Sequence, residues 1–414
     1  MTPEIKQRIE QMCRGEVPEG YKKGKLGIVP EEWNETSFST LFTSTSDYTD
    51  DLDTYPLYSL TIEDGITPKT ERYERSHLVK KEDSYKIVRP NDYAYNPMNL
   101  RFGAVARHKG DMPVAVSGYY DIFTTVFESD LPFMDSFLTC GPMITYYNRV
   151  STGSLVEKQR VHFSQFLEFM LPLPSINERT KIAAILTTQD KVIDLKEKLL
   201  GEKQRQKKYL MQQLLTGKKR LPGFYGAWSF PKAKEIFQSV SDKDHKGDLA
   251  VLSSTQDRGI VPRDEVDIDI KYDACSLVNY KKVSKGNFVI SLRSFQGGIE
   301  YSTYTGLVSP AYTVLSSRKE ISDGYYKQFF KSTDYINRLN VAVYGIRDGK
   351  QISYEDFGRL RIPYPPIKEQ DAIAEVLSTA DHEIDLLQQD IEQEKQKKKA
   401  LMQLLLTGIV RVKT

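Results

Sequence analysis

Apolar residues recur at every seventh position in two long stretches of the chain. These positions are Leu186, Ile193, Leu200 and Leu214 in the first stretch, and Leu377, Ile384, Ile391 and Leu405 in the second. A seven-residue repeat places an apolar stripe along one side of a helix, which is typical of helices that pair with one another. We therefore expect two antiparallel helices, each about 60 Å long at roughly 1.5 Å per residue over about 40 residues.

Charged residues interrupt this apolar seam. Lys203 and Lys207 occupy seam positions in the first stretch, and Glu394 and Lys398 occupy them in the second. Charges at such positions either weaken the packing of the inner part of the pair or set its register through ion pairs. The sequence leaves both possibilities open.

The two stretches also repeat each other residue by residue. The segment "LPLPSINERTKIAAIL" from Leu171 matches "IPYPPIKEQDAIAEVL" from Ile362, and "LMQQLLTG" from Leu210 matches "LMQLLLTG" from Leu401. The match continues between these points without insertions, which shared helix composition does not explain. The sequence therefore predicts an internal duplication.

Signals for the start and the end of a helix bracket each stretch. Ser175 and Glu178 stand at the spacing of a capping box, in which each residue's side chain binds the other's backbone N–H. Gly217 and Gly408 stand where a residue in the left-handed conformation closes the last turn of a helix. The predicted helices therefore have defined ends.

The segments ahead of the two helices form a second, more divergent repeat. The segment "YSLTIEDGITP" from Tyr58 matches "LSSTQDRGIVP" from Leu252, and the only tryptophans, Trp33 and Trp228, fall at equivalent places. These segments read as short strands rich in Tyr, Val, Ile and Thr, separated by Gly and Pro. Each half should therefore contain an α/β globule with a curled sheet.

The predicted fold class is α+β with an internal pseudo-twofold repeat. Two α/β globules are each followed by a long helix, and the two helices pair as an antiparallel coiled coil. The predicted boundaries are 1–25 for an N-terminal helical segment, 26–170 for the first globule, 171–220 for the central helix, 221–361 for the second globule and 362–414 for the C-terminal helix.

The composition favours a folded protein of a reducing compartment. Hydrophobic residues make up 39% and aromatic residues 11% of the chain, which argues against disorder. Cys13, Cys140 and Cys275 lie far apart without a C-x-x-C spacing, so the sequence indicates neither a disulfide framework nor a zinc site. No apolar run is long enough for a membrane span or a signal peptide, and we expect a cytoplasmic location.

The charge of the chain is balanced overall but uneven locally. The net charge is +2, from 58 basic and 56 acidic residues. The segment 196–220, however, carries nine Lys and Arg residues against Glu197 and Glu202. This excess indicates either a solvated helix face or a surface for phosphates or an acidic partner.

The order of these elements resembles the specificity subunit of Type I restriction-modification systems. The resemblance rests on two divergent globules, each followed by a helix with a "P-x-P" opening and an "LMQQLLTG"-like ending, and it covers essentially the whole chain. It implies that each globule is a target recognition domain that reads one half of a split, asymmetric DNA sequence. It also implies that the paired helices form a spacer that docks methyltransferase subunits.

The resemblance further implies a non-catalytic chain that works in a complex. The expected partners are double-stranded DNA, two methyltransferase subunits and restriction subunits, with no membrane. The chain itself would carry no cofactor or metal. S-adenosylmethionine would belong to the methyltransferase partner, and ATP and magnesium to the restriction partner.

Candidate base-reading residues are those whose side chains address base edges: Arg and Lys for guanine, Asn and Gln for adenine, with Thr and Tyr as supplements. In the first globule the candidates are Tyr58, Lys69, Arg72, Asn99, Arg101 and Tyr119. In the second globule they are Thr255, Arg258, Arg293, Gln296, Tyr312, Arg347 and Lys350. Glycines in "RSFQGG" and "YGIRDGKQ" would allow the backbone to approach DNA closely.

Two enzymatic alternatives have weaker support in the sequence. The segment "YNPM" at Tyr95 faintly matches the element with which adenine methyltransferases hold a flipped base, but no glycine-rich cofactor loop precedes it. The segment "DEVDIDIK" places Asp264, Asp269 and Lys271 in a pattern similar to that of a metal-dependent nuclease. A strand with polar residues on its wet face explains this second segment more simply.

A scaffold that is held by its coiled coil and binds no DNA is the third alternative. Its globules would need no basic concave surface. The five histidines give no support to a metal site or an acid–base site, because they lie far apart without a helical i,i+4 pair.

Overall fold

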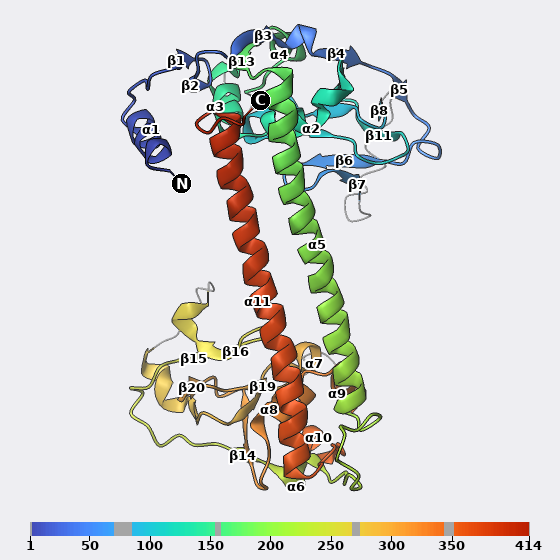
Figure 1. Ribbon diagram of the computed structural model, residues 1–414. Coiled ribbons are helices and arrows are strands. Elements are labelled where there is room, and N and C mark those ends of the chain that lie inside the picture. Colours follow the sequence, from blue (N-terminus) through green and yellow to red (C-terminus); the bar gives the residue numbers. More distant parts are fainter. Residues whose placement is uncertain (1, 70–84, 154–158, 267–273, 343–351, 414) are drawn as a thin grey trace. The chain divides into compact units, whose positions relative to one another are not determined.

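The computed structural model describes residues 2–69, 85–153, 159–266, 274–342 and 352–413. The chain divides into two compact units: unit 1 comprises Met1–Lys196 and Ile391–Thr414, and unit 2 comprises Glu197–Asp390. Each unit holds one globule and one half of each long helix, α5 (Ile176–Leu214) and α11 (Ile367–Leu406) (Figure 1). Among the described residues, no helix is long and apolar enough to cross a membrane.

Unit 1 contains thirteen described strands and several short helices. Its strands are β1 (Tyr21–Gly24), β2 (Gly27–Pro30), β3 (Asn34–Ser37), β4 (Phe42–Thr45), β5 (Tyr48–Thr49), β6 (Tyr58–Thr61), β7 (Gly65–Pro68), β8 (Tyr85–Val88), β9 (Tyr93–Tyr95), β10 (Val105–Arg107), β11 (Val114–Ser117), β12 (Asp121–Thr125) and β13 (Met170–Leu173). Its other helices are α1 (Pro3–Cys13), η1 (Phe38–Thr40), η4 (Leu100–Phe102), η5 (Glu128–Asp130), α2 (Leu131–Phe137), α3 (Gly141–Val150) and α4 (Phe163–Leu167).

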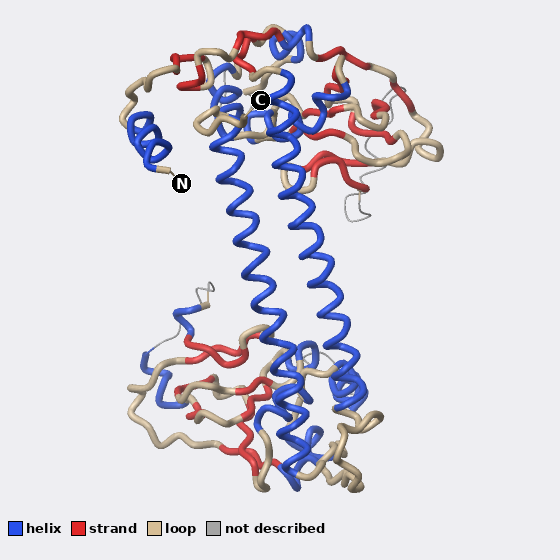
Figure 2. Tube along the Cα trace, in the orientation of Figure 1, coloured by secondary structure: helices blue, strands red, loops and turns tan. Residues whose placement is uncertain are grey.

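Unit 2 repeats this mixture of short strands and short helices (Figure 2). Its strands are β14 (Phe237–Val240), β15 (Leu252–Thr255), β16 (Gly259–Pro262), β17 (Lys281–Val283), β18 (Phe288–Ile290), β19 (Glu300–Tyr301), β20 (Gly306–Val308) and β21 (Thr313–Ser317). Its other helices are α6 (Ala233–Ile236), η7 (Arg263–Glu265), η8 (Ala274–Asn279), α7 (Ser294–Gly297), α8 (Asp323–Phe329), α9 (Thr333–Ala342) and α10 (Tyr354–Arg359).

The central sheets of the two globules share one topology. The strand order is β10-β9-β12-β4 in unit 1 and β19-β18-β21-β14 in unit 2, and every neighbouring pair is antiparallel. Each order places equivalent strands of the predicted repeat at equivalent positions. The predicted fold class, two α/β globules each followed by a long helix, is confirmed.

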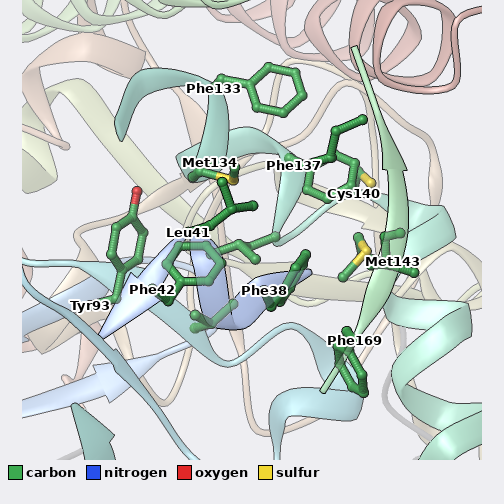
Figure 3. Packing of buried hydrophobic residues seen from close by; sticks show 14 of the residues in the cluster. Phe38, Leu41, Phe42, Tyr93, Phe133, Met134, Phe137, Cys140, Met143 and Phe169 are labelled. Atoms are coloured by element: carbon green, nitrogen blue, oxygen red, sulfur yellow. The ribbon is translucent and has the colours of Figure 1, made fainter. Parts of the chain in front are cut away.

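Aromatic side chains fill the core of each unit. In unit 1 the core joins the central sheet to α2, α3 and α4 and to the ends of the long helices that belong to this unit. Figure 3 shows part of this packing, with labelled residues Phe38, Leu41, Phe42, Tyr93, Phe133, Met134, Phe137, Cys140, Met143 and Phe169. In unit 2, Phe237, Phe288 and Phe330 lie together at the equivalent place, with ring centroids 5.2–5.6 Å apart. Each buried aromatic ring removes a large apolar area from water and so contributes to the stability of its globule.

In unit 1 a buried glutamate binds a tryptophan and an arginine that are distant from it in the sequence, and we call these three residues the closing residues of the unit. The Glu178 carboxylate is almost fully buried, and it accepts hydrogen bonds from Trp33 Nε1 at 3.3 Å and from Arg411 Nε and Nη2 at 2.6 and 3.0 Å. The predicted capping box is therefore only half formed. Ser175 Oγ accepts from the Glu178 backbone N–H at 3.3 Å, but the glutamate side chain turns to the tryptophan and the arginine instead.

Unit 2 is closed by the same three residue types. The Glu369 carboxylate is fully buried and accepts from Trp228 Nε1 at 2.9 Å and from Arg220 Nε and Nη2 at 2.6 Å each. In unit 1 the arginine follows α11, whereas in unit 2 it follows α5. Each unit therefore takes its arginine from the helix ending that comes before its globule, if the two repeats are imagined as joined in a circle.

The glycine of each "LTG" helix ending lies against the tryptophan of its unit. Gly217 and Gly408 both have φ +71°, as the sequence predicts for a left-handed helix cap. A Cβ on Gly217 would lie 3.0 Å from the Trp228 ring, and one on Gly408 would lie 2.4 Å from Pro30 Cγ and Cδ. The repeated ending thus serves two purposes, because it terminates the helix and leaves room for the ring.

Gly408→Ala should lower the free energy of unfolding of unit 1 by about 2–5 kcal/mol. A left-handed alanine costs roughly 1–2 kcal/mol, and overpacking against the Pro30 ring adds roughly 1–3 kcal/mol. Gly20→Ala is the matched control, since Gly20 has φ +76° but a Cβ added there would have no heavy atom within 4 Å. Denaturant unfolding of both variants would measure the difference, and equal losses would contradict the role of the close contact.

In unit 1, the first part of α5 and the last part of α11 run antiparallel. Asp190 pairs with Lys398 at 2.5 Å, and Lys196 pairs with Glu394 at 3.0 Å. Gln189 Nε2 also donates to the Glu394 carboxylate at 2.6 Å. The charged residues at these seam positions therefore form ion pairs with the opposite helix and are not left without partners in the apolar seam.

In unit 2, the last part of α5 and the first part of α11 also run antiparallel. Lys203 pairs with Glu383 at 2.7 Å, and Lys207 forms an ion pair with Asp381. Both lysines interrupt the apolar seam, so their ion pairs set the register of the two segments.

The seam residues are buried to different degrees. Leu186, Ile193, Leu377 and Ile391 are buried, whereas Leu200 and Ile384 are half-buried. Leu186 belongs to the core that contains Leu405 and Leu406, and Leu377 belongs to the core that contains Leu214 and Leu215. Leu186 and Leu377 therefore pack in the cores of the two globules, whereas the seam residues nearer the middle of the helices range from buried to half-buried.

Candidate nucleic-acid interface

Two equivalent hairpins carry several of the predicted base-reading residues. In β6–β7, Thr61 faces Gly65, and in β15–β16, Thr255 faces Gly259. In each hairpin the threonine Oγ1 accepts a hydrogen bond from the backbone N–H three residues later, at 3.0 Å in unit 1 and 3.1 Å in unit 2. The matching segments found in the sequence thus form the same turn twice.

The tips of these two hairpins differ in chemistry. Residues 62–64 read "IED", whereas residues 256–258 read "QDR". All six residues are exposed, including the apolar Ile62 at 51%. The frame of the hairpin is therefore shared between the units, and its exposed tip is specific to each.

In unit 2 the hairpin tip meets a second predicted reading segment, "RSFQGG". A Cβ on Gly297 would lie 2.8 Å from Gln256 Cγ, so the glutamine side chain lies directly on the glycine backbone. Lys331 Nζ donates to the carbonyl oxygens of Gln256 at 3.2 Å and Gly297 at 2.9 Å. Two turns that are separated in sequence thus form one surface.

We call the exposed residues Gln256, Arg258, Arg293 and Gln296 the unit 2 turn surface. Arg258 Nη2 donates to the Glu265 carbonyl oxygen at 3.0 Å, which directs this side chain along the hairpin. The surface offers guanidinium and amide groups, which are the groups that address guanine and adenine edges.

Two other unit 2 candidates have internal contacts. The Thr255 hydroxyl donates to the Gly259 carbonyl oxygen at 2.9 Å, so its hydrogen bonds are used within the hairpin. Tyr312 is half-buried, and burial raises the pKa of its hydroxyl, while the nearby charges of Arg263 and Arg293 act in the opposite direction. Tyr312 therefore lies close to the unit 2 turn surface, whereas Thr255 supports it from within.

In unit 1 the hairpin borders a cavity of about 370 Å³, which Tyr58 lines together with β10 and the residues after it. An ion pair lines the cavity, in which Arg107 Nε and Nη2 donate to the Asp135 carboxylate at 2.9 and 2.8 Å. The Tyr93 hydroxyl also donates to Asp135, at 2.7 Å. Burial acts to raise the pKa of Asp135, but these hydrogen bonds and the charge of Lys109 hold it below its usual value. The carboxylate therefore stays ionised and fixes the arginine.

The remaining unit 1 candidates lie at separate places. Lys69, Asn99 and Tyr119 are exposed, with Tyr119 at 46%. Arg101 is half-buried instead: its Nη1 donates to Gln159 at 3.3 Å, and its guanidinium lies 4.5 Å from the centre of the Phe102 ring. These contacts hold the Arg101 side chain against its own globule, and its contact with a base stays a prediction.

Three candidates fall outside the described residues: Arg72, Arg347 and Lys350. Two residues that the sequence did not single out stand out in the structure. Gln256 lies between two predicted candidates in the same turn, so its position was a usable signal. Lys331 lies far along the chain from both turns that it joins, and no local pattern marks it.

The segments behind the enzymatic alternatives have structural explanations where they are described. Tyr95 is fully buried and donates to the Val161 carbonyl oxygen at 3.1 Å, and Asn96 Oδ1 accepts from the Met98 backbone N–H at 3.0 Å. Asp264 lies in η7, while Asp269 and Lys271 lie outside the described residues. Within the described part of the chain, no three His, Cys, Asp or Glu side chains are grouped closely enough to hold a metal ion.

Comparisons with known proteins agree with this architecture. Residues 218–396 match the family model described as the Type I restriction modification DNA specificity domain. The putative type I restriction enzyme MjaX specificity subunit of Methanocaldococcus jannaschii is 25% identical, over 96% of this chain and 98% of the relative. The MjaVIII specificity subunit of the same organism is 27% identical, over 60% of this chain and 64% of the relative.

Solved structures support the same fold. A chain from a type I R-M system, studied for its complex assembly and conformational transition, is 14% identical with a TM-score of 0.56, over 92% of this chain and 99% of that one. The S subunit of a Type-I restriction-modification system from M. genitalium is 13% identical with a TM-score of 0.51, over 90% of this chain and 96% of that one. Residues 218–396 therefore match the DNA specificity domain of Type I restriction-modification systems, and the chain is similar along nearly its whole length to a specificity subunit of such a system.

Proposed function

We propose that the chain reads a split, asymmetric DNA target, with one half-site read by each unit. The observation that carries this proposal is the pair of equivalent hairpins, which share their register and their threonine hydrogen bond but differ at the tip. A constant frame with different exposed groups suits the reading of two different sequences from one kind of scaffold.

The unit 2 turn surface supplies the chemistry for base reading. Arg258 and Arg293 can each donate two hydrogen bonds to guanine O6 and N7, and Gln256 and Gln296 can bind adenine N6 and N7. We propose these four residues as base contacts of unit 2, together with Tyr312 at their border. In unit 1 we propose the hairpin tip with Tyr58, Lys69, Asn99 and Tyr119.

We also propose that the chain acts by positioning DNA and leaves the chemistry to its partners. Two methyltransferase subunits that carry S-adenosylmethionine would methylate the DNA, and restriction subunits that use ATP and magnesium would join them. Exposed apolar side chains on the long helices of unit 2 support such docking: Leu199 is 48%, Tyr209 54% and Leu386 51% exposed. In heptad terms all three lie on one flank of the helix pair, where a partner helix could cover them.

The test is selection of bound DNA from a random duplex library by the chain assembled with its methyltransferase. We expect enrichment of a sequence with two specified halves and an unspecified spacer. Enrichment of no sequence would contradict DNA reading and would favour a scaffold. Failure of the chain to assemble with the methyltransferase would contradict the docking proposal.

Arg293→Ala should relax the choice of base at one position of one half-site. Loss of a two-bond contact to guanine reduces discrimination by about 1–3 kcal/mol, or roughly 5- to 150-fold. Binding constants for the preferred duplex and for duplexes changed at single positions would measure this effect. An equal loss on every duplex, with a salt dependence reduced by about one counterion, would instead assign Arg293 to the phosphate backbone.

A further inference from the structure

Lys331 joins three separate segments of unit 2. It lies between α8 and α9, and its side chain is 27% exposed. Its ammonium group donates to the Gln256 carbonyl oxygen in the hairpin tip and to the Gly297 carbonyl oxygen at the end of α7. It also forms an ion pair with the Glu300 carboxylate in β19, whose side chain is only 3% exposed.

These three contacts use the whole hydrogen-bonding capacity of the lysine. An ammonium group has three N–H donors and no acceptor, and here three acceptors surround it. It therefore has no donor left for a DNA phosphate unless one of these contacts breaks. The group is placed to hold protein segments together rather than to bind DNA directly.

The buried carboxylate keeps the lysine in this position. Burial raises the pKa of Glu300, and the positive charge of Lys331 acts against this rise. The two hydrogen bonds of Lys331 hold the backbone of Gln256 and the backbone of Gly297. The Gln256 side chain contacts Gly297 directly. The hairpin tip and the "RSFQGG" turn are thus held at one mutual spacing.

We propose that Lys331 is a positioning residue for base reading, because it sets the spacing between the two turns that form the unit 2 turn surface. This inference rests on the proposed function of unit 2 as a DNA reader. Base contacts lose selectivity when the groups that make them shift by more than about 0.5 Å. Loss of the lysine should therefore alter which bases are preferred, and not only how tightly DNA binds.

The test uses the double variant Lys331→Met/Glu300→Gln in the chain assembled with its methyltransferase. This variant removes the ammonium group and the buried charge together, so that no unpaired carboxylate is left to unfold the unit. Lys327→Met is the control for the loss of a lysine charge, because Lys327 is an exposed lysine in α8 of the same unit. The double variant itself leaves the net charge unchanged. Library selection should show a loss of base preference of about tenfold at one or more positions of one half-site. The other half-site and the control should match the parent.

A second variant covers the case in which the double variant does not fold. Gly297→Ala changes no charge but would push Gln256 away, since its Cβ would lie 2.8 Å from Gln256 Cγ. It should relax the same half-site. Unchanged base preferences in a folded variant would overturn the proposal, and so would a uniform loss on all sequences with a weaker salt dependence. A parent that selects no sequence would instead contradict the proposed function itself.

Discussion

Replacing residues 38–169 with the matching globule of a related chain should change one half of the recognised sequence and leave the other half unchanged. The chain enters and leaves this globule through two paired strands, since β3 runs antiparallel to β13 with Ser37 opposite Met170. The closing residues Trp33, Glu178 and Arg411 all lie outside the exchanged segment. Each altered base pair of the half-site should shift binding by about 1–3 kcal/mol, so several together shift it by orders of magnitude.

The reciprocal exchange of residues 233–360 is the matched control. This segment is bounded by the equivalent backbone pairing in unit 2, in which Ser229 and Tyr364, and Lys232 and Arg361, form antiparallel β-bridges. It should change only the half-site that the first exchange leaves intact. Sequencing of methylated sites in cells that carry each hybrid would measure both outcomes. A hybrid that altered both half-sites, or neither, would show that the two units do not read DNA separately.

Arg220→Met should destabilise unit 2 by about 3 kcal/mol, because the fully buried Glu369 carboxylate loses its counter-charge and keeps only the Trp228 N–H. Arg411→Met should act in the same way on unit 1 through Glu178. Each unit has its own core, so each variant should affect one unit. Hydrogen exchange measured peptide by peptide would localise the loss of protection.

Lys219→Met is the control for this pair of variants. Lys219 is exposed and adjacent to Arg220, so it tests the effect of one lost charge without the buried pair. A surface substitution of this kind should change stability by less than about 0.5 kcal/mol. If Arg220→Met reduced protection no more than this control, the buried glutamate would not be a closing element of the frame.

Local patterns in the sequence predicted much of this fold. The heptads, the "LTG" endings and the hairpin segments each depend on residues within a few positions of one another, and each appears in the structure as expected. The positive φ of Gly217 and Gly408 follows from helix capping alone. Duplication strengthened these predictions, because each of these three signals occurs twice.

Contacts between distant segments were beyond the reach of such patterns. The capping-box spacing at Glu178 gave no sign that its side chain would turn to Arg411, because that partner belongs to the other end of the sequence. Lys331 likewise depends on three segments that only the folded sheet brings together. Arg101 stays a predicted reader of guanine, and no pattern in the sequence indicated that its guanidinium would lie on the Phe102 ring.

Unit 1 is built from two separate segments of the chain, and this affects the order in which the protein can fold during synthesis. Unit 2 is one continuous segment, 197–390, so all of it has been synthesised before residues 391–414 are added. Unit 1 starts first but must wait for those last residues, which supply Arg411 and the Leu405–Leu406 side of its core. Until then Ile182 and Leu186 on α5 lack their partners from α11. The core of unit 1 can therefore be completed only after the whole of unit 2 has been synthesised, which departs from the usual order in which the N-terminal domain folds first.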